Sequence, residues 1–116
     1  MSERDLSERL LNFALKCFEL NSQIPNKKEY DVLKYQFSKS STSIGANYEE
    51  SQSTTFKEFS QRIRICVREA LETRYWIKII SALKLGDKIL VEYLSKEIEE
   101  IIKILKTILR KTTNSN

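Results

Sequence analysis

Glycine and proline are almost absent from this chain, which contains two glycines and one proline in 116 residues. Tight turns depend on these two residue types, so few breaks can separate the regular segments. Lysine, glutamate and leucine, which all favour helices, are abundant. The composition therefore predicts an all-α protein made of long helices. The chain, residues 1–116, is also expected to form a single domain, long enough to bury a stable core.

Apolar residues recur at intervals of three and four, the spacing of one helix face. We predict four helices, over about 5–21, 27–52, 55–84 and 88–111, with fraying at 112–116. The short breaks favour antiparallel neighbours, so the expected architecture is an up-down-up-down four-helix bundle. The apolar positions are Leu6, Leu10, Phe13, Ala14, Cys17 and Leu20 on one face of the first helix; Val32, Leu33, Phe37, Ile44 and Tyr48 in the second; Phe56, Phe59, Ile63, Cys66, Val67, Ala70 and Ile77, which form one continuous core stripe of the third; and Ile89, Leu90, Tyr93, Leu94, Ile98, Ile101, Ile102, Ile104, Leu105, Ile108 and Leu109 in the fourth, where the apolar arc spans about half the helix circumference.

The breaks between the helices carry capping signals. Segment 26–29, Asn-Lys-Lys-Glu, has the pattern of a capping box for the second helix, and segment 55–58, Thr-Phe-Lys-Glu, has it for the third. Gly86 is expected in the left-handed conformation that ends the third helix, followed by Asp87 as the N-cap of the fourth. These signals support the predicted helix boundaries.

Segment 38–46 is unusual for a helix, because seven of its nine residues are serine, threonine, glycine or alanine. Serine, threonine and glycine lower helix propensity, so a polar loop is one interpretation. We favour a helix whose small side chains let a neighbouring helix approach closely, with tertiary packing compensating for the propensity. Ser41, Ile44 and Gly45 are then the candidate helix-packing positions.

The sequence offers little for catalysis. It has no histidine, which removes the commonest general base and metal ligand. A glycine-rich phosphate loop and a nucleophile elbow are also absent. Cys17 and Cys66 occupy apolar helix positions and are predicted to be buried free thiols. We therefore predict no enzyme, no cofactor and no small-molecule substrate.

Four glutamates could in principle form an all-carboxylate metal site. They are Glu49, Glu50, Glu69 and Glu72. Solvated or salt-bridged roles are favoured over metal binding, because Arg68 and Arg74 are close in the sequence. No metal site is predicted.

The formal net charge of +4 is unevenly distributed. Residues 1–53 carry seven basic and eight acidic side chains, and residues 87–116 carry six and five. Residues 54–86 carry seven basic side chains but only three acidic ones. The excess positive charge therefore lies on the third helix, where it could mark a face for an anionic partner.

Lys57, Gln61, Arg64, Arg68 and Tyr75 fall on one stripe of the third helix, about a third of a turn from its core stripe. Cations attract a phosphate backbone and release its counterions, and a tyrosine ring can stack on an exposed base. Lys57, Arg64, Arg68 and Tyr75 are therefore candidate nucleic-acid-binding residues. The alternative is a solvated face that keeps the protein soluble.

Residues 75–80, Tyr-Trp-Ile-Lys-Ile-Ile, are apolar around most of the helix, and the fourth helix has an apolar arc wider than one core face needs. A single four-helix protomer covers only one face of each helix. This predicts a homo-oligomer with Trp76 and Ile79 at the interface. The alternative is that Trp76 packs under the connection between the second and third helices.

No run of about 18 uncharged apolar residues occurs, so no membrane-spanning helix is expected. The first 25 residues are amphipathic and charged, unlike a secretory signal. A cytoplasmic protein without a membrane partner is predicted.

Several motifs together resemble a known family. They are Ser-Ser-Thr-Ser-Ile-Gly-Ala-Asn at 40–47 with Glu-Glu at 49–50, Phe-Lys-Glu-Phe at 56–59, Glu-Ala-Leu-Glu-Thr-Arg-Tyr-Trp-Ile at 69–77, and Leu-Lys-Leu-Gly at 83–86. In this order and spacing they resemble the four-helix-bundle proteins known as 23S rRNA intervening-sequence proteins. The resemblance covers nearly the whole chain. The same family includes the accessory variability protein of diversity-generating retroelements.

The resemblance implies a protomer that assembles into a ring-like homopentamer. Members are encoded in insertions of bacterial large-subunit rRNA genes or beside reverse transcriptases, and most have no established activity. The accessory variability proteins are basic barrels that bind the reverse transcriptase and nucleic acid, whereas this chain has only a mild net charge. We expect a non-catalytic oligomeric scaffold associated with RNA or a nucleoprotein, with a reverse transcriptase as one such partner. The alternative is an oligomeric protein-interaction adaptor with no nucleic-acid role.

Overall fold

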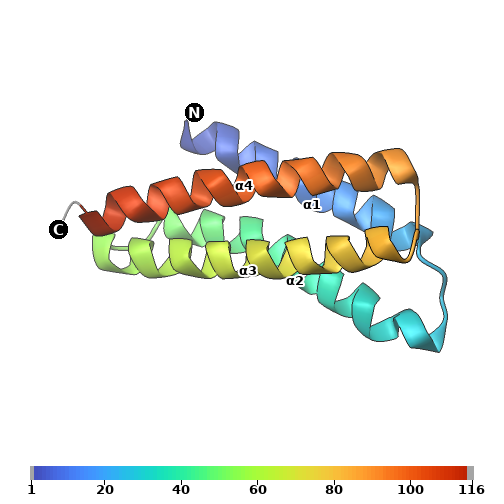
Figure 1. Cartoon of the computed structure of the whole chain (residues 1–116). Helices are drawn as coiled ribbons and strands as arrows, with labels where there is room; N and C mark the ends of the chain where they lie inside the picture. Colours follow the sequence, from blue (N-terminus) through green and yellow to red (C-terminus); the bar gives the residue numbers. More distant parts are fainter. Residues whose placement is uncertain (1, 115–116) are drawn as a thin grey trace.

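The computed structural model describes residues 2–114, which form four α-helices and one short 3-10 helix and contain no strand. The body is elongated, about 47 × 24 × 20 Å, and the N- and C-terminal ends lie at the same end of it (Figure 1). None of the described helices is long and apolar enough to cross a membrane. The elements are α1 (Glu3–Gln23), η1 (Lys28–Tyr30), α2 (Asp31–Ser51), α3 (Phe56–Ala82) and α4 (Lys88–Asn114).

Consecutive helices run antiparallel, as their cross-helix contacts show. Thr73 of α3 donates a hydrogen bond to Ser40 of α2 at 2.9 Å. Further along α2, the Ile44 carbonyl accepts from Cys66, which precedes Thr73 in α3. The all-α class and the antiparallel four-helix arrangement are therefore those that the apolar periodicity predicted.

Capping explains where the helices differ from the predicted boundaries. α1 begins at Glu3, earlier than predicted, because Ser2 and Asp5 form a capping box in which Asp5 N donates to Ser2 Oγ at 3.1 Å. The predicted box at 26–29 is wrong. Asn26 Oδ1 instead accepts from Nζ of Lys34 at 2.6 Å, so α2 is preceded by η1 and begins only at residue 31.

The other capping signals are confirmed in part. Thr55 and Glu58 form a reciprocal capping box at the start of α3. Gly86 is left-handed as expected, with a φ of 72°, but it does not end α3. That helix ends at Ala82, before the predicted residue 84, where Lys84 has a φ of 56° and Leu85 N donates to the Ile80 carbonyl at 3.0 Å. Asp87 Oδ2 accepts from the backbone N of Leu90 at 2.9 Å in the first turn of α4, as expected of an N-cap. α4 continues to residue 114, beyond the predicted end at 111, while residues 115–116 lie outside the described part of the chain.

The core runs the length of the bundle, but several of the apolar positions that predicted the helices lie outside it, including Phe56 of the predicted core stripe. Val32 is 68% exposed, Phe56 58%, Ile89 76% and Tyr93 45%. The first three lie in the first turn of their helices, which the neighbouring helices leave uncovered. Val32 also precedes Leu33, whose side chain points into the core. Successive helix residues point about 100° apart, so only one of such a pair can enter the core.

The small-residue segment of α2 is helical throughout, which excludes the polar loop. Its hydroxyl groups bond to carbonyl groups one turn earlier, such as Ser43 Oγ to Lys39 O at 2.7 Å. Ser41 and Ile44 are buried. A Cβ added to Gly45 would lie 3.5 Å from Cβ of Leu10 in α1. The two helices therefore approach closely enough here for an added methyl group to make ordinary contact with Leu10 of α1.

Both cysteines are buried free thiols, as predicted. Burial raises the pKa of each, and it raises that of Cys66 to about 12. Cys66 Sγ donates to the carbonyl oxygen of Ile44 at 3.5 Å, so this thiol is part of the contact between α2 and α3.

Candidate nucleic-acid interface

Five residues form the side of α3 that points away from the bundle, and we call them the outer stripe: Lys57, Gln61, Arg64, Arg68 and Tyr75. All five are exposed, because the core residues lie about half a turn away around the helix, further than the third of a turn expected from the sequence. At 1.5 Å per residue, the stripe extends about 27 Å along the helix axis. Arg64 and Arg68 are one turn, about 6 Å, apart on this axis.

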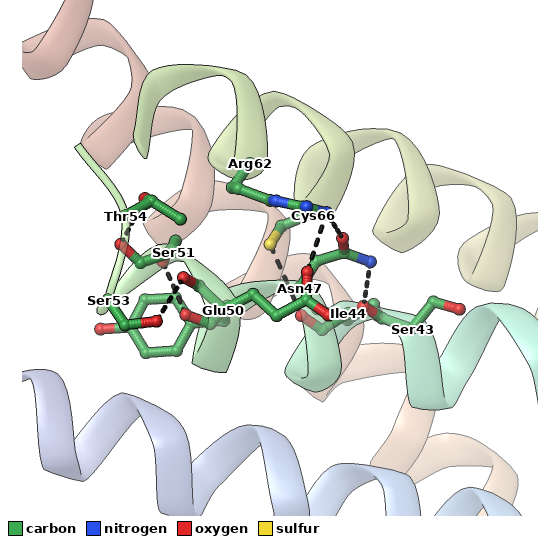
Figure 2. A network of polar contacts seen from close by, with 10 residues as sticks. Ser43, Ile44, Asn47, Glu50, Ser51, Ser53, Thr54, Arg62 and Cys66 are labelled. Atoms are coloured by element: carbon green, nitrogen blue, oxygen red, sulfur yellow. Dashed lines mark hydrogen bonds and ion pairs between the residues drawn. The ribbon is translucent and has the colours of Figure 1, made fainter. Parts of the chain in front are cut away.

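Two other arginines of α3 are held against neighbouring helices. Arg62 reaches α2, where its Nη1 lies 2.9 Å from Oε2 of Glu50 and donates to Oδ1 of Asn47 at 3.1 Å (Figure 2). Arg74 reaches α4, where its Nη1 lies 3.1 Å from Oε1 of Glu99. The charges of both arginines are therefore compensated within the bundle.

The cations of the outer stripe are arranged differently. Among the residues that the structure describes, Lys57, Arg64 and Arg68 form no ion pair and no side-chain hydrogen bond. Three positive charges thus face solvent along one side of one helix. An uncompensated array of this kind attracts a polyanion, since a polyanion gains entropy by releasing its own counterions.

Tyr75 continues the stripe with an aromatic ring that is 57% exposed. Its ring packs edge-to-face against Trp76, with 5.3 Å between the ring centroids and 63° between the planes. Trp76 Nε1 in turn donates to Oε2 of Glu72 at 3.1 Å. The contact with Trp76 therefore helps to hold the Tyr75 ring in one orientation, and the exposed surface of the ring is accessible for stacking.

Two of the four glutamates considered as a metal site have other partners. Glu50 and Glu72 bind the α3 side chains described above, and Arg74, a predicted partner, instead binds Glu99. Burial and the neighbouring charge of Glu72 raise the pKa of Glu69. Within the described part of the chain, no three histidine, cysteine, aspartate or glutamate side chains lie together as metal ligands would.

Trp76 and Ile79, predicted to face a second copy, are half-buried and pack against the core of their own protomer. Trp76 does not lie under the connection between α2 and α3. It is twenty residues from Phe56 at the start of α3, which is about 30 Å along the helix. Only part of each side chain is available to a partner, and their role in self-association stays a prediction.

The structure also exposes an apolar surface that sequence reasoning missed. Leu11, Leu15 and Phe18 of α1 are 58%, 55% and 50% exposed. They follow the i, i+4, i+7 spacing of one helix face, so α1 carries a second apolar stripe beside its core stripe. This spacing was the available signal, since one bundle helix needs only one apolar face. Beside the stripe lies a groove of about 350 Å³ between α1 and α2.

The four antiparallel helices define the class of the chain as an all-α, four-helix protein. The family model of the 23S rRNA-intervening sequence protein matches residues 3–107. The chain therefore belongs to the 23S rRNA-intervening sequence protein family, as its motifs indicated.

A solved structure supports the fold. The chain is similar to a protein of unknown function from Bacteroides thetaiotaomicron, described as a member of the S23 ribosomal protein family. The two share 28% sequence identity with a TM-score of 0.80, over 90% of this chain and 97% of that one. A search of curated proteins finds no significant match.

Proposed function

We propose that this protein is a non-catalytic, oligomeric, cytoplasmic scaffold that associates with RNA or a nucleoprotein through the outer stripe of α3. The observation that carries the proposal is the contrast among the arginines of α3. Arg62 and Arg74 are bound to carboxylates of the bundle, whereas Arg64 and Arg68 face solvent and form no ion pair with a described residue. The name of the family, which refers to intervening sequences of 23S rRNA, favours RNA as the polyanion.

Self-association would compensate for the mild net charge of one chain. In a ring-like oligomer, such as the pentamer that the resemblance implies, each copy repeats the outer stripe. Several weak sites can then act on one RNA, and avidity can raise the affinity by about 10²–10⁴ where the geometry permits. The exposed parts of Trp76 and Ile79 and the apolar stripe of α1 supply surface for such contacts.

The salt dependence of RNA binding tests the proposal. Each cation that neutralises a phosphate adds about 0.7 to 0.9 to the slope of log affinity against log salt. Replacing Arg64 and Arg68 together with alanine should therefore flatten the slope by about 1.4 to 1.8 and leave the oligomeric mass unchanged. Lys27→Ala with Lys28→Ala is the matched control, because it removes two exposed charges away from the stripe.

The second candidate function is a protein-interaction adaptor, which the exposed apolar stripe of α1 favours. Light scattering after size exclusion should give a multiple of the 13.6 kDa chain mass for either function. A monomeric mass at micromolar concentration would contradict the oligomer. An oligomer that does not bind structured RNA at low salt would leave the adaptor as the better account.

A further inference from the structure

One end of the bundle contains an open pocket. A pocket of about 510 Å³ opens where the two described chain ends lie, and all four helices line it. Leu6 and Tyr48 are buried at its inner side, and Phe59, Ile104 and Ile108 are core side chains that remain partly uncovered. The interior surface is therefore mainly apolar.

The rim of this pocket is basic. Lys103 and Lys111 of α4 both line it, eight residues and thus about 12 Å apart along the helix. The lining residues include no aspartate or glutamate in the described part of the chain. Neither lysine forms an ion pair or a side-chain hydrogen bond with a described residue. An elongated apolar surface thus lies beside two uncompensated positive charges.

We propose that this end pocket binds a single-chain amphipathic carboxylate of the fatty-acid type. The apolar chain would lie along Ile104 and Ile108, and the carboxylate would pair with Lys103 or Lys111. The volume is within the range of about 300–1,000 Å³ typical of small-molecule pockets. The pairing supplies the charge that the lining lacks, while the chain covers apolar surface that the protomer leaves open.

A second copy related by a two-fold axis fits this pocket less well. A two-fold contact would bring the same surface of each copy together, so Lys103 and Lys111 would face the lysines of the partner. Like charges placed together in an interface oppose association. The basic rim therefore favours an anionic ligand over a two-fold contact between copies.

Calorimetric titration of the full chain with decanoate, below its micelle-forming concentration, tests the proposal. Decanoate should bind saturably at one molecule per chain, and decanol and acetate should bind far more weakly. Lys103→Ala with Lys111→Ala should reduce decanoate affinity about fivefold, because the carboxylate pairs with one lysine and one exposed ion pair contributes up to about 1 kcal/mol. The matched control is Lys96→Ala with Lys106→Ala, two exposed lysines of α4 outside the pocket.

A filling variant provides a second test that does not alter the lysines. Thr107 lies between them in the lining, so Thr107→Phe should place a ring in the pocket and abolish decanoate binding while the helical circular dichroism is retained. Absence of saturable decanoate binding to the parent protein would overturn the proposal. Equal affinity for decanol, or unchanged affinity in the double lysine variant, would also overturn it, because the basic rim would then play no part.

Discussion

The packed faces of α2 and the outer stripe of α3 use polar residues in opposite ways. On α2, polar and small side chains are committed to neighbours: Ser40 to Thr73 of α3, and Gly45 to a close contact with Leu10 of α1. On the outer stripe, polar side chains such as Arg64 have no intramolecular partner. Polar side chains thus contribute to helix packing in one region and have no intramolecular partner among the described residues in the other.

This difference means that residue type alone does not reveal function in a helical bundle. Arg62 and Arg64 are two positions apart on one helix, but they point about 200° apart around its axis. One therefore meets Glu50 of α2 and the other meets solvent. Substitutions in the two regions should differ in what they change, stability in the first and binding in the second.

The largest effect is expected at Gly45, on the α1-facing side of α2. Gly45→Leu adds three carbon atoms beyond a Cβ that already lies 3.5 Å from Cβ of Leu10. Overpacking of this kind should lower the free energy of unfolding by about 1–3 kcal/mol, measured by thermal or urea denaturation.

Gly45→Ala is the matched control for that experiment. The added methyl group makes only ordinary contact with Leu10, and alanine restricts the unfolded chain. This variant should therefore raise stability by about 0.4–1 kcal/mol. An unchanged melting temperature in Gly45→Leu would mean that the two helices yield there, so that α2 is not closely packed against α1.

The α3-facing side of α2 should show a dependence on alkaline pH. Burial raises the pKa of Cys66 to about 12, whereas an unfolded cysteine has a pKa of about 8.5. Between these values the unfolded chain loses a proton that the folded chain keeps, so the unfolded state is favoured as pH rises. Cys66 should thus reduce the free energy of unfolding by about 1.4 kcal/mol per pH unit above that lower value.

The measurement is urea denaturation of the parent protein and of Cys66→Ala at pH 8 and pH 10. The free energy of unfolding should fall less between pH 8 and pH 10 in Cys66→Ala than in the parent protein. This holds even if the substitution itself lowers stability at both pH values. Parallel pH dependence in the two proteins would show that the Cys66 thiol ionises as readily in the folded chain as in the unfolded one.

The fold was largely predictable because helix periodicity and capping are local properties of the sequence. The stripe from Leu6 to Leu20 and the Thr55 cap needed no knowledge of distant residues. Where prediction was wrong, a contact outside the local capping or periodic pattern decided the outcome. Asn26 could have capped α2, but Lys34 takes its side-chain oxygen. Val32 has the same apolar character as Leu33, and only the position of the neighbouring helices selects between them.

The candidate site was predictable in part for the same reason. The periodicity of α3 places the outer stripe opposite its core, so exposure of Arg64 and Arg68 follows from the sequence. The sequence does not show which arginines of α3 form ion pairs, because their partners Glu50 and Glu99 belong to other helices. The end pocket depends on how far α1 stands from α4, and no local pattern encodes that distance.

The smallest effect on stability is expected at the arginines of α3. These variants compare an arginine bound within the bundle with one on the outer stripe. Arg62→Ala removes a partly exposed ion pair with Glu50 and a hydrogen bond to Asn47, so it should cost up to about 1 kcal/mol. Arg64→Ala removes no intramolecular partner, and its stability should stay within about 0.5 kcal/mol of the parent. RNA affinity at low salt should respond in the reverse order, with the larger loss in Arg64→Ala.

Urea denaturation and RNA titration of the two variants side by side would measure both the stability and the RNA affinity. Equal losses of RNA affinity would mean that the polyanion senses only the total charge of α3, and the outer stripe would then be no distinct binding surface.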